Sequence, residues 1–233
     1  MIPTRISATI VSATDLSATA REVTLRPQKP IRFLAGSFVN LFLPTDGGVV
    51  RRAYSISSDP VQVETFTISV RRVPQGLGST FFWQPDVVGK TVEVMGPLGR
   101  NTSDKLTHNR VFLFGFGIGV SVIKALAHYC VNQPSIRQIV IMTGNRNEEE
   151  VLYRAEFEHL AATDRRVVFH PVLSNPLNPH TTDRAGFIQQ HVHNFDFTNS
   201  SIYLCGQPHA CTALQDVIHA QGDAGADMFV ESF

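Results

Sequence analysis

The sequence predicts a two-domain protein in which an antiparallel β domain precedes an α/β domain with a parallel sheet. In the first hundred residues, short β-branched or aromatic segments are separated by turn residues such as PTDGG at 44–48, a pattern typical of an antiparallel barrel or sandwich. After residue 110, apolar segments alternate with helical ones, which indicates a parallel sheet with crossover helices. The polar stretch 101–109 separates the two patterns, so we place the boundary after residue 104.

The first half contains six segments in which apolar and polar residues alternate or nearly alternate, as expected for strands. Turn residues bound these segments, and most of them have no helical pattern between them. The expected strands cover residues 6–14, 21–27, 37–44, 53–57, 64–73 and 90–97.

The second half begins with the apolar strand 111–115. A helix over 122–131 follows, because Val122, Leu126 and Cys130 fall on one face of it. Further strands and helices then alternate along the chain. The expected strands are 138–144, 166–174 and 201–206, and the expected helices are 148–162, 187–195 and 210–221.

The composition is that of an ordinary globular protein. Its 20 basic and 20 acidic residues cancel, so neither nucleic acid nor an anionic membrane is an expected partner. No apolar run is long enough for a spanning helix and the first residues lack the apolar centre of a signal peptide, so we expect a cytoplasmic protein. The three cysteines are too few for a disulfide framework or for an iron–sulfur cluster, which takes about four thiolates.

Two strand-to-helix connections carry turn-forming residues. FGFGIGVS contains Gly117 and Gly119, and YLCGQP contains Cys205. Glycines there let a ligand approach the backbone, and the following helix N-terminus offers free N–H groups. A tight turn without a ligand explains the glycines equally well, and a buried apolar role is the usual one for a lone cysteine. Because ligands bind beyond the carboxyl ends of parallel strands, Gly117 and Cys205 could face one crevice.

The stretch 51–58 (RRAYSISS) is unusually polar for a barrel strand. Arg52 and Tyr54 are two residues apart and would share a face, which suits a ligand with both a flat ring and a phosphate group. The loop 75–82 offers hydroxyl and N–H groups that could hold the same phosphates. A polar edge strand is the alternative interpretation of 51–58.

Together, these motifs resemble the ferredoxin–NADP reductase superfamily. They are R-x-Y-S at 52–55, G-S-T at 78–80, G-P-L-G at 96–99, the glycine turn at 117–121, C-G-x-P at 205–208 and a terminal E-x-aromatic. The resemblance implies an antiparallel six-stranded Greek-key β-barrel that binds FAD, residues 1–104, and an α/β NAD(P)-binding domain, residues 105–233. It also implies a reductase without an iron–sulfur domain of its own.

The resemblance gives each matching residue a role. Arg52 would bind the flavin diphosphate, Tyr54 would pack along the flavin, and Ser55 would place its hydroxyl near the reactive edge. Further FAD contacts would come from Val70, Gly78, Ser79, Thr80 and Phe233. NAD(P) contacts would come from Gly117, Ile118, Gly119, Val120, Ser121, Cys205, Gly206 and Pro208. The expected catalytic residues are Tyr54, Ser55, Cys205 and, ranked last, Glu231.

Several positions depart from the family pattern. Ser121-Val122 stands where relatives often have Thr-Pro, and Arg100 stands where an aromatic residue is common. Ser174-Asn175 stands where NADPH-selective members tend to have Ser-Arg. Arg146 and Arg184 remain candidate contacts for a 2′-phosphate, although an exposed loop suits Arg146 equally well. The balance slightly favours NADH.

The implied function is that of a FAD-dependent NAD(P)H reductase that passes electrons to a separate protein, such as a ferredoxin, a flavodoxin or an oxygenase component. A flavin reductase that releases reduced flavin is one alternative, and a non-catalytic nucleotide-sensing module is another. No metal site is expected, because His191 and His193 would not share a face of the expected helix.

Overall fold

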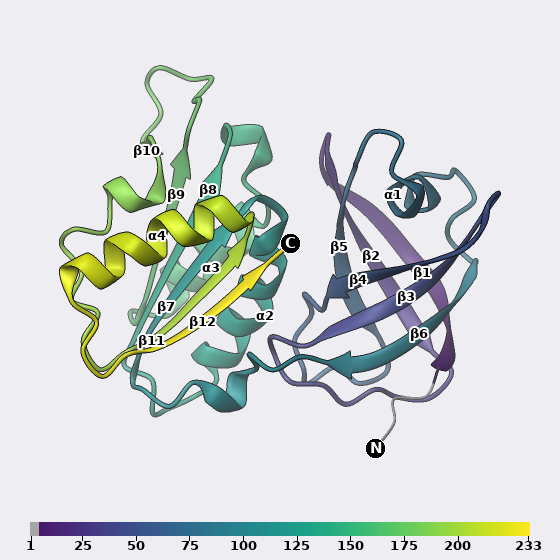
Figure 1. Ribbon diagram of the computed structural model, residues 1–233, viewed down its shortest axis with the longest axis horizontal. Coiled ribbons are helices and arrows are strands. Elements are labelled where there is room, and N and C mark those ends of the chain that lie inside the picture. The colour runs from purple at the N-terminus through teal and green to yellow at the C-terminus, as the bar shows by residue number, and fades with distance from the viewer. Residues whose placement is uncertain (1–4) are drawn as a thin grey trace. The chain divides into compact units, whose positions relative to one another are not determined.

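The computed structural model describes residues 5–233 (Figure 1). The chain forms two compact units, which divide between Thr102 and Ser103. The predicted boundary after residue 104 falls inside the short turn η1 (Ser103–Lys105), just past this division.

The first unit is a six-stranded antiparallel barrel. Its strands neighbour one another in the order β4-β3-β6-β1-β2-β5, and a bridge between Ile56 and Ile68 links the chain after β4 to β5. Because β6 lies between β1 and β3, the connectivity is that of a Greek key. The strands are β1 (Arg5–Ser17), β2 (Ala20–Pro27), β3 (Phe38–Thr45), β4 (Gly48–Ser55), β5 (Phe66–Arg71) and β6 (Thr91–Leu98).

Alternate residues of these strands fill the barrel. Ala8 and Ile10 of β1, and Val23 and Leu25 of β2, are at most 1% exposed. Their spacing of two is the spacing of side chains on one face of a strand. All six predicted strands are confirmed, and β4 begins at Gly48 rather than at residue 53.

Helix α1 (Leu77–Phe82) connects β5 to β6, where the sequence predicted a loop. That prediction was wrong because glycine, serine and threonine are weak helix formers and hide the helical signal. The helix forms because Phe81 and Phe82 bury their rings in the barrel core, where they are 3% and 0% exposed. Tertiary packing therefore overrides local propensity in this connection.

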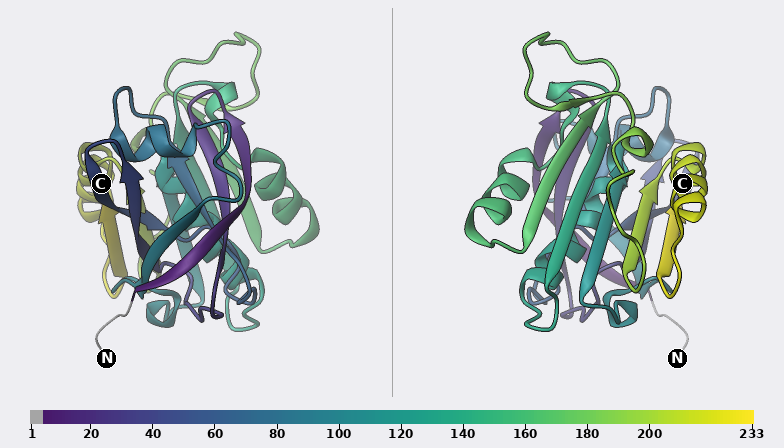
Figure 2. Two further views of the ribbon diagram at one scale, coloured as in Figure 1. Left: turned by 90° about the vertical axis from the view of Figure 1, so that its right-hand side faces the viewer. Right: turned by 90° about the vertical axis from the view of Figure 1, so that its left-hand side faces the viewer.

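The second unit is a parallel sheet in the order β10-β9-β8-β7-β11-β12 (Figure 2). Helices α2 and α3 cover one face and α4 covers the other. The strands are β7 (Arg110–Phe116), β8 (Gln138–Asn145), β9 (Val167–Leu173), β10 (Arg184–Ala185), β11 (Ser201–Gly206) and β12 (Asp227–Ser232). The helices are α2 (Val120–Val131), α3 (Arg154–Thr163) and α4 (Pro208–Gln221). No helix within residues 5–233 is long and apolar enough to cross a membrane.

The helix predicted over 148–162 is broken in the structure. The turn η3 (Glu148–Glu150) comes first, and α3 begins only at Arg154. Tyr153 has a φ of 58°, a left-handed conformation that a continuous right-handed helix does not contain.

The helix predicted over 187–195 was wrong. Only the single turn η4 (Ile188–Gln190) forms there. The Gln221 side chain donates to the carbonyl oxygens of Val192 at 3.2 Å and His193 at 3.1 Å, which holds the segment in an irregular course. Ile188 and Val192 are four residues apart and both buried, which gave this connection its helix-like spacing.

Strand β12 was not predicted. It pairs with β11 in parallel from Ser201↔Asp227 to Gly206↔Ser232, so it adds a strand to the sheet beyond β11. Its burial is only partial, and the short run DMFVES carries no clear alternation for sequence reasoning to detect.

Arg166 ties the start of β9 to the end of α2. Its guanidinium donates to the carbonyl oxygens of Gln133 and Ile136, each at 2.9 Å, and of Val131 at 2.6 Å. These carbonyls lie at and beyond the helix end, where backbone acceptors lack helical partners.

Arg166→Lys should therefore lower the free energy of unfolding by about 2 kcal/mol, because lysine keeps the charge but loses the fork of donors. Urea unfolding followed by circular dichroism measures the change. Arg165→Lys is the matched control, since the Arg165 side chain is exposed. Equal stability of the two variants would contradict the role given to Arg166.

Candidate FAD and nicotinamide nucleotide sites

Arg52, Tyr54 and Gly78 meet where β4 passes the first turn of α1. A Cβ atom on Gly78 would lie 2.9 Å from Cγ of Arg52 and 3.2 Å from the Tyr54 hydroxyl oxygen. Both distances are shorter than ordinary van der Waals contact, so glycine leaves the room that the two side chains occupy. The structure thus brings the motifs 52–55 and 78–80 together.

Tyr54 is fixed by packing. It lies against the barrel core, and its ring meets Phe82 edge to face, with ring centroids 5.6 Å apart. Burial raises the pKa of Tyr54 to about 12, although the nearby charge of Arg52 opposes the shift. The hydroxyl is therefore protonated at neutral pH and can donate a hydrogen bond.

The Arg52 side chain is exposed and donates to the Arg51 carbonyl oxygen at 2.9 Å. A guanidinium has five N–H donors, so most of them are left to bind an anion. Ser55 is half-buried at the end of β4, where it pairs with Phe38 of β3.

Val70 and Ser79 point into the protein. Val70 is 1% exposed in the barrel core. The Ser79 hydroxyl accepts the Val73 N–H at 3.1 Å and donates to the carbonyl oxygens of Val73 and Gly76 at 3.0 Å. These two residues can reach a cofactor only through backbone atoms, whereas the sequence suggested a free hydroxyl at Ser79.

Thr80 is exposed and lines a hollow of about 460 Å³ beside α1. Leu77 and Phe81 of the same helix line it too, together with Thr45 and Asp46 of the β3–β4 turn. Arg52, Tyr54 and Gly78 do not line this hollow, so a contact between Thr80 and FAD stays a prediction.

Gly78→Ala should raise the dissociation constant of FAD about tenfold, because the new methyl group displaces Arg52 and Tyr54. Alanine favours a helix by about 1 kcal/mol over glycine, so the same change should not lower the melting temperature. Calorimetric FAD binding and thermal unfolding measure the two effects. Gly47→Ala is the control, since nothing lies within 4 Å of a Cβ atom there. Unchanged affinity would contradict the contact.

Gly119 and Gly206 let the turns after β7 and β11 touch backbone to backbone. A Cβ atom on Gly119 would lie 2.2 Å from the Cys205 carbonyl oxygen, and one on Gly206 would lie 2.6 Å from that of Phe116. Gly206 also has a φ of 144°, which side chains disfavour. The strand order reverses between β7 and β11, and ligands of open parallel sheets bind at such a point.

The N-terminus of α2 opens directly onto this edge. The turn η2 (Gly117–Gly119) runs into Val120, the first residue of the helix. The Ser121 hydroxyl donates to the Ile118 carbonyl oxygen at 2.9 Å and closes the turn. The Val120 N–H donates to the Gly117 carbonyl oxygen, so the N–H groups that could bind a phosphate are those of η2, ahead of the helix. On the neighbouring connection, Pro208 occupies the first helical position of α4.

Cys205 is 0% exposed. Burial, and then the nearby Glu231 carboxyl group, raise the pKa of the Cys205 thiol well above its usual value. The thiol therefore stays protonated, which agrees with the interpretation of a lone cysteine as a small buried residue. Its contribution to a nucleotide site would come from size and shape.

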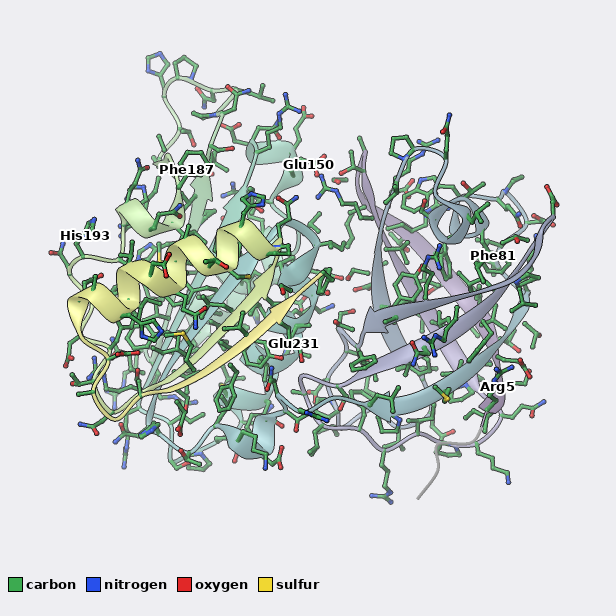
Figure 3. The ribbon with its side chains drawn as sticks, viewed as in Figure 1. Arg5, Phe81, Glu150, Phe187, His193 and Glu231 are labelled. Carbon is green, nitrogen blue, oxygen red and sulfur yellow. The ribbon has the colours of Figure 1, made fainter. Side chains whose placement is uncertain are left out.

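Glu231 lies on β12 (Figure 3), and the register of β11 and β12 pairs it with Cys205. Burial raises the pKa of Glu231, and a hydrogen bond from Tyr203 opposes the shift. Phe233 is 59% exposed, and its N–H donates to the Gly206 carbonyl oxygen at 3.1 Å. Sequence reasoning missed Tyr203, although its position two residues before Cys205 on one strand face was a readable signal.

Arg146 and Arg184 lie on separate parts of the sheet. Arg146 follows β8 and is exposed, and its carbonyl oxygen accepts the Asn175 N–H at 2.7 Å. Arg184 is on β10, with its guanidinium 3.3 Å from Nε2 of His170. Strand β9 separates β8 from β10, so a 2′-phosphate contact by both arginines stays a prediction.

The described residues contain no group of three or more histidine, cysteine, aspartate or glutamate side chains that could hold a metal ion. His191 instead approaches the Ala185 carbonyl oxygen, with Nε2 at 2.8 Å.

Known proteins match both units. Residues 7–102 match the family model of the oxidoreductase FAD-binding domain, and residues 113–216 match that of the oxidoreductase NAD-binding domain. Over 228 residues the chain is 30% identical to ferredoxin–NADP reductase B of Sorangium cellulosum (strain So ce56), a match that covers 94% of this chain and 92% of that protein. The chain belongs to the ferredoxin–NADP reductase superfamily.

Other relatives of this reductase are named as reductases of oxygenase or cytochrome P450 systems. It is 31% identical over 231 residues to the reductase component DmpP of phenol 2-monooxygenase from Pseudomonas sp. (strain CF600). That match covers 96% of the reductase but 64% of DmpP, so the chain spans less than two thirds of this relative. The crystal structure of the Amycolatopsis cytochrome P450 reductase GcoB superposes with a TM-score of 0.90 at 25% identity, covering 99% of the reductase and 70% of GcoB.

FAD is the cofactor of the reductase and NAD(P)H is its substrate. The barrel fits FAD because an exposed guanidinium and a neutral tyrosine hydroxyl lie together over Gly78 at one helix end. The sheet fits a nicotinamide nucleotide because two glycine turns meet at the reversal of strand order.

Proposed function

We propose that the reductase moves hydride from NAD(P)H to FAD and passes the electrons to a separate redox protein, either an oxygenase component or a ferredoxin. The assembly of Arg52, Tyr54 and Gly78 into one contact carries the proposal, because it builds the flavin side from residues far apart in the sequence. Relatives named as reductase components of phenol and glycine betaine monooxygenases, and as the electron transfer component of toluate 1,2-dioxygenase, support the choice of acceptor.

The residues divide the work by position. Arg52 and the first turn of α1 bind the diphosphate, Tyr54 packs along the flavin, and Ser55 places its hydroxyl at the reacting edge. The turns at Gly119 and Gly206 bind the nicotinamide nucleotide. FAD, when bound, supplies the hydride acceptor and the one-electron donor. The protein must orient the reacting atoms about 3–3.5 Å apart.

The zero net charge of the reductase conceals opposite charges on its two units. Residues 1–102 contain 11 basic and 7 acidic side chains, whereas residues 103–233 contain 9 basic and 13 acidic ones. The unit with the flavin residues is thus positive and would attract an acidic protein. This asymmetry favours a protein acceptor over release of reduced flavin, and the whole-chain composition did not reveal it.

Gel filtration of the FAD-loaded reductase, followed by anaerobic titration with NADH and then NADPH, tests the proposal. We expect FAD to remain bound, to be bleached by one of the two nucleotides, and to reduce an acidic ferredoxin at a rate that falls with added salt. Loss of FAD on the column would favour a flavin reductase. Retained FAD that neither nucleotide bleaches would favour a nucleotide sensor. The cytoplasmic location stays a prediction.

A further inference from the structure

Tyr203 is a buried phenol with a specific partner. It lies on β11 and is 1% exposed, so its hydroxyl needs a hydrogen-bond partner inside the protein. That partner is the side chain of Glu231 on the neighbouring strand. The register pairs Tyr203 with Phe229 and Cys205 with Glu231. The Tyr203 hydroxyl therefore reaches past Phe229 to the next β12 side chain on the same sheet face.

Two side chains of β11 lie beside the Glu231 carboxyl group. Tyr203 and Cys205 approach it from β11, and both have a raised pKa for which burial is the main cause. Cys211, on α4, contacts only the backbone of this residue, with its sulfur 4.0 Å from the Glu231 carbonyl oxygen. Neither thiol is ionised at neutral pH, because burial raises the pKa of Cys211 to about 11 and the pKa of Cys205 well above its usual value. The Tyr203 hydroxyl is thus the strong donor in this group.

The bond is not needed to hold β12 in the sheet. A continuous parallel ladder joins the two strands from Ser201↔Asp227 to Gly206↔Ser232. The Phe233 N–H extends this attachment to the Gly206 carbonyl oxygen at 3.1 Å. Loss of one side-chain hydrogen bond leaves the ladder intact, so the specific effect of Tyr203 falls on the carboxyl group.

We propose that Tyr203 is a positioning residue whose hydroxyl holds the Glu231 carboxylate beside Cys205, at the sheet edge where NAD(P)H binds. The inference rests on the proposed function, because it gives the held carboxylate a part in the reduction of FAD. A phenol that donates to a carboxylate favours its charged form, whereas burial disfavours it. Without the donor, Glu231 should lose its charge at a higher pH.

The test compares the full-length wild type, Tyr203→Phe, Glu231→Gln and the double variant. Carbon NMR of protein labelled at glutamate carboxyl carbons follows the Glu231 titration, with Glu231→Gln identifying the signal. We expect Tyr203→Phe to move this titration upward by about one to two pH units, since a hydrogen bond to a charged group contributes about 1.5–3 kcal/mol. Tyr129→Phe, on α2, is the control and should leave the titration in place.

Anaerobic stopped-flow reduction of FAD across pH supplies the second readout. The acid limb of the rate profile should move upward by the same amount in Tyr203→Phe and be absent in Glu231→Gln. The double variant should match Glu231→Gln, because the hydroxyl acts through the carboxylate. An unmoved Glu231 titration would overturn the proposal, and so would a moved titration with an unmoved rate profile. If NAD(P)H failed to reduce wild-type FAD at all, the proposed function would fall while the NMR titration still decided the positioning of Glu231.

Discussion

Arg52→Ala is expected to weaken FAD binding about a hundredfold. The substitution removes a guanidinium held at the first turn of α1, where Gly78 makes room for it. Loss of two charge-assisted hydrogen bonds to a diphosphate corresponds to about 3 kcal/mol, and each 1.4 kcal/mol is about tenfold in a dissociation constant. The side chain is exposed, so the barrel itself should remain as stable as before.

Calorimetry and FAD retention on gel filtration measure this effect. Arg51→Ala is the matched control, because Arg51 is also exposed but projects from the opposite strand face. Arg52→Lys should fall between the wild type and alanine, since lysine keeps the charge without the two-pronged geometry. Equal FAD affinity of the Arg51 and Arg52 variants would refute the assignment of Arg52.

Gly119→Ala should abolish NAD(P)H-driven reduction while FAD stays bound. The added methyl group would sit 2.2 Å from the Cys205 carbonyl oxygen and 2.7 Å from the Gly206 nitrogen. Both are backbone atoms of the neighbouring turn, so no flexible side chain can move aside. The two turns must separate, and the surface that binds the nicotinamide nucleotide is lost with them.

Stopped-flow reduction by NAD(P)H measures the expected loss of nucleotide binding. Photochemical reduction shows whether FAD is still bound and reducible. Photoreduction should proceed normally in Gly119→Ala, whereas reduction by NADH or NADPH should fall by about a thousandfold or more, equal to about 4 kcal/mol of lost nucleotide binding and orientation. Gly47→Ala, in an open turn, is the control for glycine replacement. Normal reduction by NAD(P)H in Gly119→Ala would show that the turn does not bind the nucleotide.

The sequence predicted the architecture well because periodicity is a local signal. Alternation gave the six barrel strands, and the change to strand–helix alternation located the second unit. The misses had tertiary causes. Helix α1 depends on two buried phenylalanine rings, and the segment 187–195 is held open by Gln221, which is remote in the sequence.

In the candidate site, too, local motifs were predictable and tertiary contacts were not. The motifs named Arg52, Tyr54 and the glycine turns, because backbone approach and ligand charge restrict the residue type at such positions. They could not show where side chains point. The Ser79 hydroxyl is committed to its own loop, and the partner of Glu231 becomes visible only once β12 is placed beside β11.

The bond between the Phe233 N–H and the Gly206 carbonyl oxygen has a practical consequence for handling the protein. Any residues appended after Phe233 would emerge at the turn that follows β11, over the surface where we place the nicotinamide nucleotide. An affinity tag fused there should act as a competitive obstruction and raise the apparent KM for NAD(P)H. Purification tags therefore belong ahead of Met1, and kinetic constants from carboxyl-tagged preparations should be compared with those of the cleaved protein.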